Sequence, residues 1–499
     1  MPSNSDIGTA ETVNRFVNEG LLITKDALEL LRRSATREIY EKVVSNAVRM
    51  AKEERASTVE VKHISAAFAL SKVEAAETGR IRTVPFAKDV EPQVELLYNP
   101  SDIIPASDSV ESRVRYFRSR FERLERILRS RPDFSSATPV KEITGGDSRG
   151  LYKTIVMVTK KENRRLVAED LSGSATLVFP KRASPDLEEK LSYLTVDMVV
   201  GLEVRKFQGV LVINDVLLPD VPDTPAVKAR VPIVSVLISD LHVGSNFFLE
   251  KELASFIEWL SGTKGTASSR EIAGSVKYVI VAGDVADGVF VYPRQESELK
   301  IVSLEEQYGK AAEMLSKVPD HVHIIIGPGN HDIVRDAAPQ PPIPDELLEE
   351  LASERGNVTL VGSPAQVSLH RVKFLVYHGQ SLEDVAASIP SVEYSRPHDG
   401  MRLLLRARHV APVYGGNTQI CAEGEDDLVI SNKPDVFHAG HVHVAGISSY
   451  RGTQIVNSGT WQDTTPYQAN LGIRATPATF GVHFMKEGKS TLLALTDVV

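Results

Sequence analysis

The spacing of apolar residues changes several times along this chain, and each change marks a new kind of element. From Glu11 to Lys72 apolar residues recur at helical spacing, as Val43 and Ala47 do. Within this stretch, residues 57–64 predict a short strand followed by a helix. We therefore expect an all-α docking domain over residues 1–75, and a plain helical bundle without a special partner is the alternative.

No period persists from residue 76 to residue 110, where prolines recur. Such a segment is typical of an extended or partly disordered linker. Residues 114–129 then return to helical spacing, with arginines on the faces that the apolar stripe leaves free. The stripe consists of Phe117, Phe121, Leu124 and Leu128. The stripe predicts packing, whereas the arginine face either contacts phosphates or is simply solvated.

Between residues 139 and 223 the apolar period becomes two, which predicts short strands separated by turns. Five strands are expected, at 155–158, 165–170, 175–179, 199–204 and 210–214. Together with the preceding arginine-rich helix they predict an OB-fold β-barrel domain over residues 111–225.

One turn of this predicted barrel is basic and offers candidate contacts to DNA phosphates. Its basic residues are Lys160, Lys161, Arg164 and Arg165. Few aromatic residues interleave the strands to stack bases, so a barrel that only docks another protein is an equal alternative.

After residue 223 strands and helices alternate, which predicts a layered α/β domain over residues 226–499. Five apolar runs in this part each stop at a short polar motif. The motifs are Asp240-Leu241-His242, Gly283-Asp284, Gly329-Asn330-His331-Asp332, His378-Gly379 and Gly440-His441-Val442-His443. Because strand ends gather at one edge of such a domain, these side chains are expected to converge.

The converging side chains carry carboxylate, amide oxygen and imidazole groups. This mixture suits Mn²⁺, Zn²⁺ or Fe²⁺ better than Ca²⁺, and the lack of a thiolate argues against structural zinc. There are enough ligands for two divalent ions about 3.5–4 Å apart. We expect two ions, Mn²⁺ first and Mg²⁺, Zn²⁺ or Fe²⁺ as alternatives.

Composition narrows the class of protein. A chain of 499 residues is too long for one hydrophobic core and predicts about three domains. The net charge of −9 gives no sign of nucleic-acid binding, but bound metal ions would bring their own positive charge. The single cysteine, Cys421, excludes an internal disulfide framework and fits a reducing cytosol. With no signal-peptide pattern and no apolar run near the roughly 20 residues of a membrane span, a cytoplasmic protein is expected.

The five motifs together resemble those of the calcineurin-like metallophosphoesterase superfamily, over about residues 233–456. The resemblance implies a two-metal phosphoesterase sandwich. One ion would be held by Asp240, His242, Asp284 and His443. The second would be held by Asp284, Asn330, His378 and His441. His331 would face the scissile phosphate as a transition-state stabiliser or general acid, and Asp332 would orient it.

Protein phosphatases of this superfamily carry an arginine soon after the second motif, and here Asp284-Val285-Ala286-Asp287-Gly288 has none. With the barrel upstream, and with residues 377–381, 408–412 and 434–441 around the later motifs, the chain closely resembles the small subunits of archaeal family D DNA polymerases. This resemblance covers residue 114 to the C-terminus and is weak before it.

The second resemblance implies a proofreading 3′–5′ exonuclease that acts on DNA primer 3′ ends. It also implies a heterodimer with a large polymerising subunit, and a sliding clamp reached through that complex. Two alternatives stay open: a non-catalytic B-subunit scaffold that holds the large subunit, and a free-standing phosphodiesterase.

Overall fold

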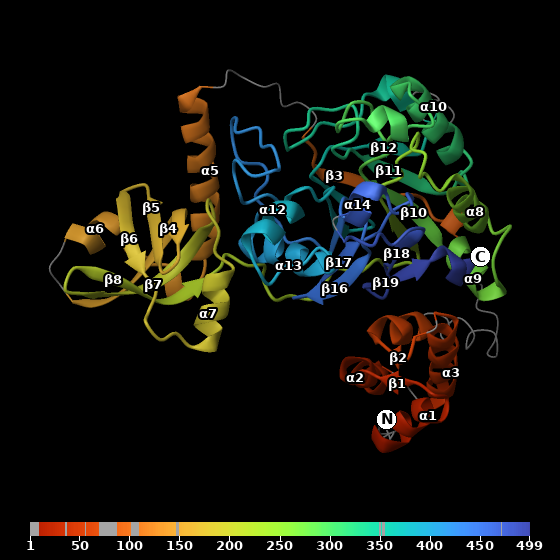
Figure 1. Ribbon diagram of the computed structural model, residues 1–499, viewed down its shortest axis with the longest axis horizontal. Helices are drawn as coiled ribbons and strands as arrows, with labels where there is room; N and C mark the ends of the chain where they lie inside the picture. The colour runs from red at the N-terminus through yellow and green to blue at the C-terminus, as the bar shows by residue number, and fades with distance from the viewer. Residues whose placement is uncertain are drawn as a thin grey trace.

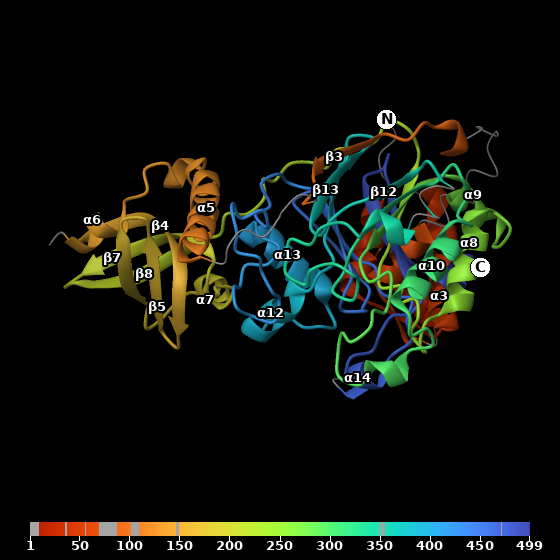
Figure 2. The same cartoon turned by 90° about the horizontal axis from the view of Figure 1, so that it is seen from above.

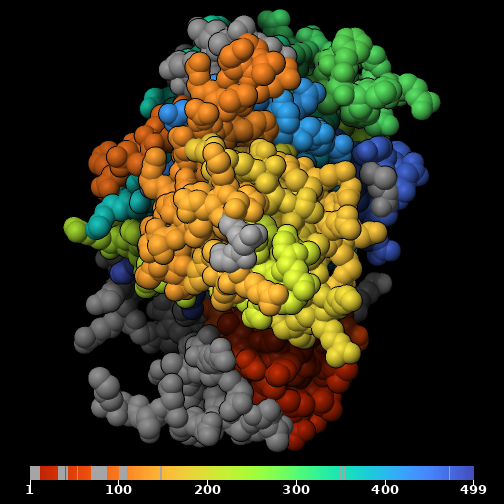
Figure 3. Space-filling view, turned by 90° about the vertical axis from the view of Figure 1, so that its left-hand side faces the viewer, coloured from red at the N-terminus to blue at the C-terminus, as the bar shows by residue number. Residues whose placement is uncertain are grey.

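The structure is a computed structural model that describes residues 9–34, 37–54, 56–68, 87–100, 109–145, 149–348, 351, 355–470 and 472–499. A β-barrel forms one end of the molecule and a large sandwich of sheets and helices forms the other (Figures 1 and 2). The long helix α5 (Val110–Arg129) stands on the side of the barrel that faces the sandwich. Seen from the barrel end, the N-terminal helices lie below the barrel (Figure 3).

The described part of the N-terminal module contains helices and a small two-stranded sheet. The helices are α1 (Thr9–Asn18), α2 (Lys25–Ser34) and α3 (Arg37–Glu53), and residues 61–68 are also helical. The strands β1 (Leu22–Ile23) and β2 (Thr58–Val59) pair in parallel, so the expectation of an all-α module was wrong in this respect. These segments lie between helices, where their backbone groups lack helical partners and hydrogen-bond to each other instead. The end of the predicted domain, residues 69–75, lies outside the described residues.

Part of the segment predicted as a linker belongs to the sandwich. Residues 87–89 form the short helix η1 (Ala87–Asp89), and β3 (Val94–Tyr98) pairs antiparallel with β13 (Ala365–Leu369). As an edge strand, β3 leaves Leu96 46% and Leu97 37% exposed. Leu96 and Leu97 are adjacent and so lie on opposite faces of the strand. Because both faces carry apolar, partly exposed side chains, the sequence shows no alternation of apolar and polar residues there.

The sandwich contains two six-stranded sheets. The first has the order β12-β11-β10-β9-β18-β19 and the second β16-β17-β15-β14-β13-β3. The strands of the first are β9 (Val234–Ile238), β10 (Val276–Ala282), β11 (His323–Gly327), β12 (Val358–Leu360), β18 (Thr479–Phe484) and β19 (Lys489–Ala494). The remaining strands of the second are β14 (Val372–Val376), β15 (Val436–Ala439), β16 (Gly446–Tyr450) and β17 (Thr453–Asn457).

Helices cover the outer faces of the two sheets, and the central core lies between the sheets. Buried side chains from both sheets meet there, such as Leu237 and Ile280 from the first and Phe374 and Val456 from the second. The helices packed against the first sheet are α8 (Glu250–Leu260), α9 (Ala267–Gly274), α10 (Leu304–Leu315) and α15 (Leu495–Val498). Those beside the second are α12 (Ser381–Ser388) and α13 (Pro397–Ala407). Shorter helices are η3 (Gln295–Glu298), η4 (Asp345–Leu348) and α14 (Pro466–Asn470).

Strand direction gathers the motifs at one place. β9, β10, β11 and β12 run parallel, as do β14, β15 and β17. Parallel neighbours end at the same edge of a sheet, so the loops that follow them lie next to each other.

The barrel is closed, with the strand order β4-β5-β6-β8-β7. Its strands are β4 (Gly150–Glu162), β5 (Arg165–Asp170), β6 (Gly173–Val178), β7 (Val199–Phe207) and β8 (Val210–Leu217). The helices α6 (Val140–Gly145) and α7 (Pro185–Ser192) accompany them, and η2 (Pro132–Phe134) follows α5. Alternate residues such as Val158, Leu166 and Leu202 are fully buried inside, as the period of two predicts.

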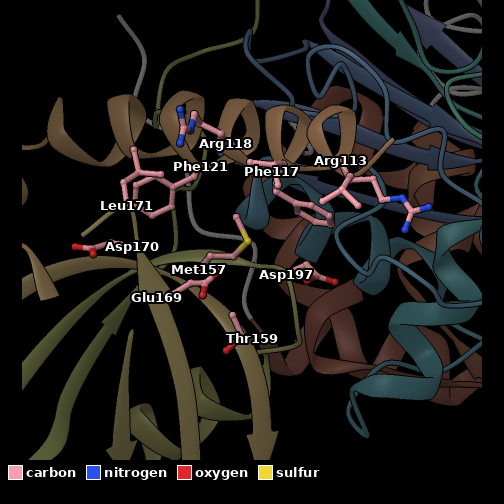
Figure 4. Close-up of a pocket in the computed structure, with 12 residues that line it drawn as sticks. Arg113, Phe117, Arg118, Phe121, Met157, Thr159, Glu169, Asp170, Leu171 and Asp197 are labelled. Carbon is pink, nitrogen blue, oxygen red and sulfur yellow. The ribbon is translucent and has the colours of Figure 1, made fainter. Parts of the chain in front are cut away.

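Helix α5 packs its predicted apolar stripe against the barrel. Phe121, Leu124 and Leu128 are buried together with Ile155 and Met157 of β4. A hollow of about 450 Å³ lies beside this contact, between α5 and the strands β4 and β5 (Figure 4). Among the described helices, none is both long and apolar enough to cross a membrane.

Candidate metal centre

Loops at the ends of five strands bring the predicted metal ligands together. Asp240 and His242 follow β9, Asp284 follows β10, Asn330 follows β11, His378 follows β14, and His441 and His443 follow β15. Five of these residues have left-handed backbones, with φ values from 50° to 70°. They are Asp240, His242, Asp284, His441 and His443. Such conformations are strained for residues other than glycine and persist where the surrounding structure fixes them, as at functional sites.

The first predicted ligand set is compact. His242 Nε2 lies 3.0 Å from His443 Nε2 and 3.6 Å from Asp284 Oδ2. His443 Nε2 lies 3.4 Å from Asp240 Oδ1. All four side chains are at least 94% buried. These are the separations of ligand atoms that surround one small ion.

The second predicted set lies next to the first. His378 Nε2 is 3.1 Å from both Asp284 Oδ2 and Asn330 Oδ1. His441 Nδ1 is 3.0 Å from the same Asn330 oxygen. Because Asp284 Oδ2 borders both sets, its carboxylate stands where a group shared by two ions would stand.

Hydrogen bonds orient the imidazole rings for cation binding. His378 Nδ1 donates to the carbonyl oxygen of Ala282 at 2.8 Å, so in the neutral ring Nε2 carries a lone pair. That lone pair faces two further acceptors, the oxygens of Asp284 and Asn330. Three acceptors facing one another are stable only around a proton or a metal ion, and the donor types suit Mn²⁺, Zn²⁺ or Fe²⁺.

Electrostatics favour a charged carboxylate in this buried place. Burial by itself would raise the pKa of Asp284, but the imidazoles of His378, His331 and His242 outweigh it and hold the pKa well below its usual range. Burial lowers the pKa of His378, and the charges of Asp284 and Asp240 more than reverse this and raise it to about 9. The site thus stabilises positive charge at its centre.

Two glycines let the ligand loops approach one another. Gly283 has φ 89°, and a Cβ there would overlap His378 Nδ1 and come within 2.8 Å of Gly329 Cα. A Cβ on Gly329 would overlap the Asp284 carboxylate. Both motif glycines are therefore required by close contact.

His331 stands beside the two ligand sets and is half-buried. Its Nδ1 donates to the carbonyl oxygen of Asp287 at 2.7 Å, and its ring centroid is 4.7 Å from that of His242. Its backbone N–H donates to Asp284 Oδ1 at 2.9 Å. The ring is therefore fixed with Nε2 as its available nitrogen.

Asp332 does not orient His331 in the way the sequence suggested. Its carboxylate accepts hydrogen bonds from the backbone of Gly329, Val285 and Ala286 and from the hydroxyl of Tyr308. Burial and the neighbouring charge of Asp284 raise the pKa of this carboxyl to about 6. Asp332 ties the loops after β10 and β11 together, and the group that orients His331 is the carbonyl of Asp287.

Sequence reasoning missed several supporting residues. Asp287 Oδ1 lies 3.0 Å from His242 Nδ1, which leaves His242 Nε2 to face the ligand set. Gln295 and Gln462 in turn donate to the Asp287 carboxylate. Glu383 Oε1 lies 3.2 Å from His441 Nε2. The position of Asp287, three residues after Asp284, was the available signal. Gln295, Gln462 and Glu383 are brought in only by folding.

The basic residues predicted to contact DNA lie on the barrel, around the turn between β4 and β5. Lys160 pairs with Glu162 at 2.6 Å, and Arg164 donates to the carbonyl of Pro180. Lys161 Nζ donates to the carbonyl oxygen of Leu194 at 2.7 Å, and burial lowers its pKa. Lys161 thus has a structural contact, whereas Arg165 is exposed.

Comparison with known proteins places the chain in a family. Residues 235–445 match the family model that describes the B subunits of DNA polymerases alpha and epsilon. The DNA polymerase II small subunit of Archaeoglobus fulgidus is 38% identical over 379 residues, which cover 75% of each chain. That of Methanothermobacter thermautotrophicus is 33% identical over 468 residues, which cover 92% of this chain and 94% of the relative. Among solved structures, zinc-complexed Vps29 from Entamoeba histolytica is similar at 13% identity and a TM-score of 0.26, over 52% of this chain and 90% of Vps29. The chain belongs to the family of small subunits of archaeal DNA polymerase II, the family D polymerases.

Proposed function

We propose that this chain is a metal-dependent 3′–5′ exonuclease that proofreads primer ends within a two-subunit DNA polymerase. The observation that carries the proposal is the position of Asp284, whose Oδ2 borders both ligand sets while its Oδ1 accepts from His331 N–H. One carboxylate thus connects two cation-binding sets with the histidine next to them. This is the arrangement that two-metal hydrolysis of a phosphate ester requires.

Asp240, His242, Asp284 and His443 would hold one ion, and Asp284, Asn330, His378 and His441 the other. Mn²⁺ is the proposed metal, and Mg²⁺, Zn²⁺ or Fe²⁺ would fit the same donors. Two such ions, when bound, neutralise charge on the phosphate and lower the pKa of a water molecule for attack on phosphorus.

His331 is the proposed general acid. Its Nδ1–H is committed to the Asp287 carbonyl, so the proton that His331 gives up as an acid would be one carried on Nε2. That proton would pass to the 3′ oxygen of the penultimate nucleotide as the P–O3′ bond breaks. The attacking water supplies the new oxygen on phosphorus, and the product is a nucleoside 5′-monophosphate.

DNA is the proposed substrate for two reasons. Asp284 is not followed by the arginine with which protein phosphatases of this superfamily bind a phosphate monoester. The five-stranded barrel, with a helix between its third and fourth strands, supports an OB fold of the kind that binds single strands. We propose Lys160, Lys161, Arg164 and Arg165 as its phosphate contacts, with Lys161 the weakest candidate because its ammonium already binds carbonyls.

The proposed partner is a large polymerising subunit, and a sliding clamp would be reached through that complex. The relatives are named as small subunits, which supports such a pair. We propose the boundaries 1–75, 76–110, 111–225 and 226–499 for the helical domain, the linker, the barrel domain and the phosphoesterase domain. Because β3 pairs with β13, part of the proposed linker belongs structurally to the phosphoesterase domain.

A nuclease assay tests the proposal. The full chain, alone and with the large subunit, is given 3′-labelled single-stranded and mismatched primer DNA with Mn²⁺ or Mg²⁺. We expect release of nucleoside 5′-monophosphates, lost in Asp240→Ala and in His331→Ala and kept in His321→Ala, a histidine outside the site. Full activity of the first two variants would overturn the assignment, and a wild-type chain without activity in any combination would favour the scaffold alternative.

A further inference from the structure

The loop that begins at Asp287, whose carbonyl accepts from His331, displays an exposed aromatic side chain. Phe290 is 78% exposed, and its backbone is left-handed with φ 62°. A large apolar side chain and a strained backbone each cost free energy at an exposed position. Both occur at one residue, three positions after the carboxylate that supports His242.

This loop is fixed on both sides of Phe290. Gln295, fully buried, accepts from Val291 N–H at 2.8 Å and donates to the Asp287 carbonyl at 2.8 Å. Gln307, also fully buried, accepts from Gly288 N–H at 2.9 Å. Phe290 is therefore held in its exposed position by a rigid loop.

The loop is in direct contact with the catalytic candidate His331. The Asp287 carbonyl accepts from His331 Nδ1, and a Cβ on Gly288 would meet the His331 carbonyl oxygen at 2.5 Å. The Tyr292 ring centroid lies 6.2 Å from that of His331. Phe290 lies between these two contacts in the sequence.

A second exposed aromatic residue lies next to another ligand loop of the centre. Tyr467, on α14, is 68% exposed, and the next residue, Gln468, contacts His443 Nδ1 at 2.8 Å. Residues 245–248 join the two aromatic segments, since Ser245 bridges to Leu299 and Phe248 bridges to Gln462.

We infer that Phe290 and Tyr467 are positioning residues that stack on bases near the 3′ end of a single DNA strand and so place its last phosphodiester at the metal centre. The inference rests on the proposed exonuclease function. Bases stack on exposed aromatic rings whatever their sequence, which suits an enzyme that must remove any mismatched nucleotide. A ring displayed by a rigid loop loses little conformational entropy on stacking.

Binding and activity are measured separately to test this inference. Binding of a short, 5′-labelled single-stranded oligodeoxynucleotide to the full chain is followed by fluorescence anisotropy. Phe290→Ala and Tyr467→Ala should each raise Kd about tenfold, as expected for the loss of one base–ring stack. Phe290→Trp, which keeps an aromatic ring at this position, should bind the strand with the Kd of the wild type. Leu22→Ala is the control, because Leu22 is an apolar residue 63% exposed on β1, outside both the metal centre and the barrel.

An oligonucleotide whose two 3′-terminal nucleotides lack bases separates stacking from a structural effect. The wild type should bind it about a hundredfold more weakly than the normal strand, because both stacks are lost, whereas the double variant Phe290→Ala/Tyr467→Ala should bind both strands alike. In the nuclease assay both single variants should raise KM for the normal strand about tenfold and leave KM for the base-free strand at the wild-type value.

The outcomes distinguish the two proposals. Unchanged Kd in Phe290→Ala and Tyr467→Ala, or an equal loss for normal and base-free strands, would overturn the stacking inference. A wild-type chain that binds the strand through Phe290 but hydrolyses DNA neither alone nor with the large subunit would overturn the exonuclease proposal and leave the stacking inference standing.

Discussion

Arg120 and Asp426 form a fully buried ion pair, although 306 positions separate them in the sequence. Arg120 Nε on α5 lies 2.5 Å from Asp426 Oδ2, and its Nη1 donates to the carbonyl oxygens of Pro412 and Asp197. His409 Nε2 lies 2.9 Å from the same carboxylate oxygen. This group of side chains holds the barrel's helix against the sandwich, so it fixes the position of the two parts.

Removal of the Asp426 charge should weaken the contact between the barrel's helix and the sandwich. Asp426→Asn leaves the Arg120 guanidinium buried without its counter-charge, and we expect a loss of about 3–5 kcal/mol in the free energy of unfolding. A urea titration of the full chain measures it. Arg120→Met/Asp426→Leu, which removes both charges, should be less damaging than Asp426→Asn. Equal urea midpoints for wild type and Asp426→Asn would contradict the prediction.

Acid should weaken the same contact. Burial and the nearby charge of Arg120 lower the pKa of His409 from its ordinary 6.5 to about 4. Between these two values the unfolded chain binds the proton and the folded chain does not, so the stability contribution is complete above pH 6.5 and is lost as the pH falls toward 4. Asp426, whose pKa is held below its ordinary 3.8 by Arg120 and His409 despite burial, adds a further loss at still lower pH.

Thermal unfolding followed across this pH range measures the effect. The melting temperature of the wild type should fall steadily below pH 6.5. His409→Gln removes the titrating ring, so its melting temperature should depend less on pH in the same interval. An equally steep decline in that variant would assign the acid sensitivity to other groups, such as His483, whose pKa burial lowers to about 3.

Asp287 should control metal affinity although it is not one of the predicted ligands. Asp287→Asn removes the negative charge that favours Nδ1–H on His242, and we expect metal affinity to fall about 10–100-fold. Calorimetric titration with Mn²⁺ gives the affinity. Asp215→Asn, on barrel strand β8, is the control and should bind as the wild type does. Unchanged affinity in Asp287→Asn would remove Asp287 from the support of the site.

Tyr308 should stabilise the loops around His331 through Asp332. Its hydroxyl donates to Asp332 Oδ1 at 2.8 Å and accepts from Ile333 N–H at 3.0 Å. Tyr308→Phe leaves both groups without this partner, which should cost roughly 1–3 kcal/mol. Urea unfolding measures the change, with Tyr467→Phe, at an exposed position, as the control. If Tyr308→Phe unfolds at the wild-type midpoint, Asp332 does not depend on this bond.

Local pattern was informative where burial is one-sided. The five barrel strands and the stripe on α5 follow from the period of their residues, because each packs against a single core. The apolar runs before the motifs are continuous instead, because strands such as β9 and β10 are buried on both faces. Strand β3 was not predicted, because an edge strand with both faces half-exposed has no such pattern. In the N-terminal module the short strand predicted within residues 57–64 is present as β2, whereas its partner β1 was not predicted, because two residues are too few to show a period.

The sequence by itself determined which chemical groups the site would contain, since carboxylate, amide and imidazole ligands follow consecutive apolar runs and parallel strands end at one edge. Only the tertiary structure decided how those groups are used. In the folded chain Asp332 accepts hydrogen bonds from the backbone of two loops, and His331 donates to the carbonyl of Asp287. The Asp287 carboxylate in turn contacts His242 Nδ1. The tertiary structure also brought the segments that carry Phe290 and Tyr467 into contact with His331 and His443. Hydrogen bonds between segments so distant in the sequence depend on loop conformations, several of them left-handed, that no local pattern encodes.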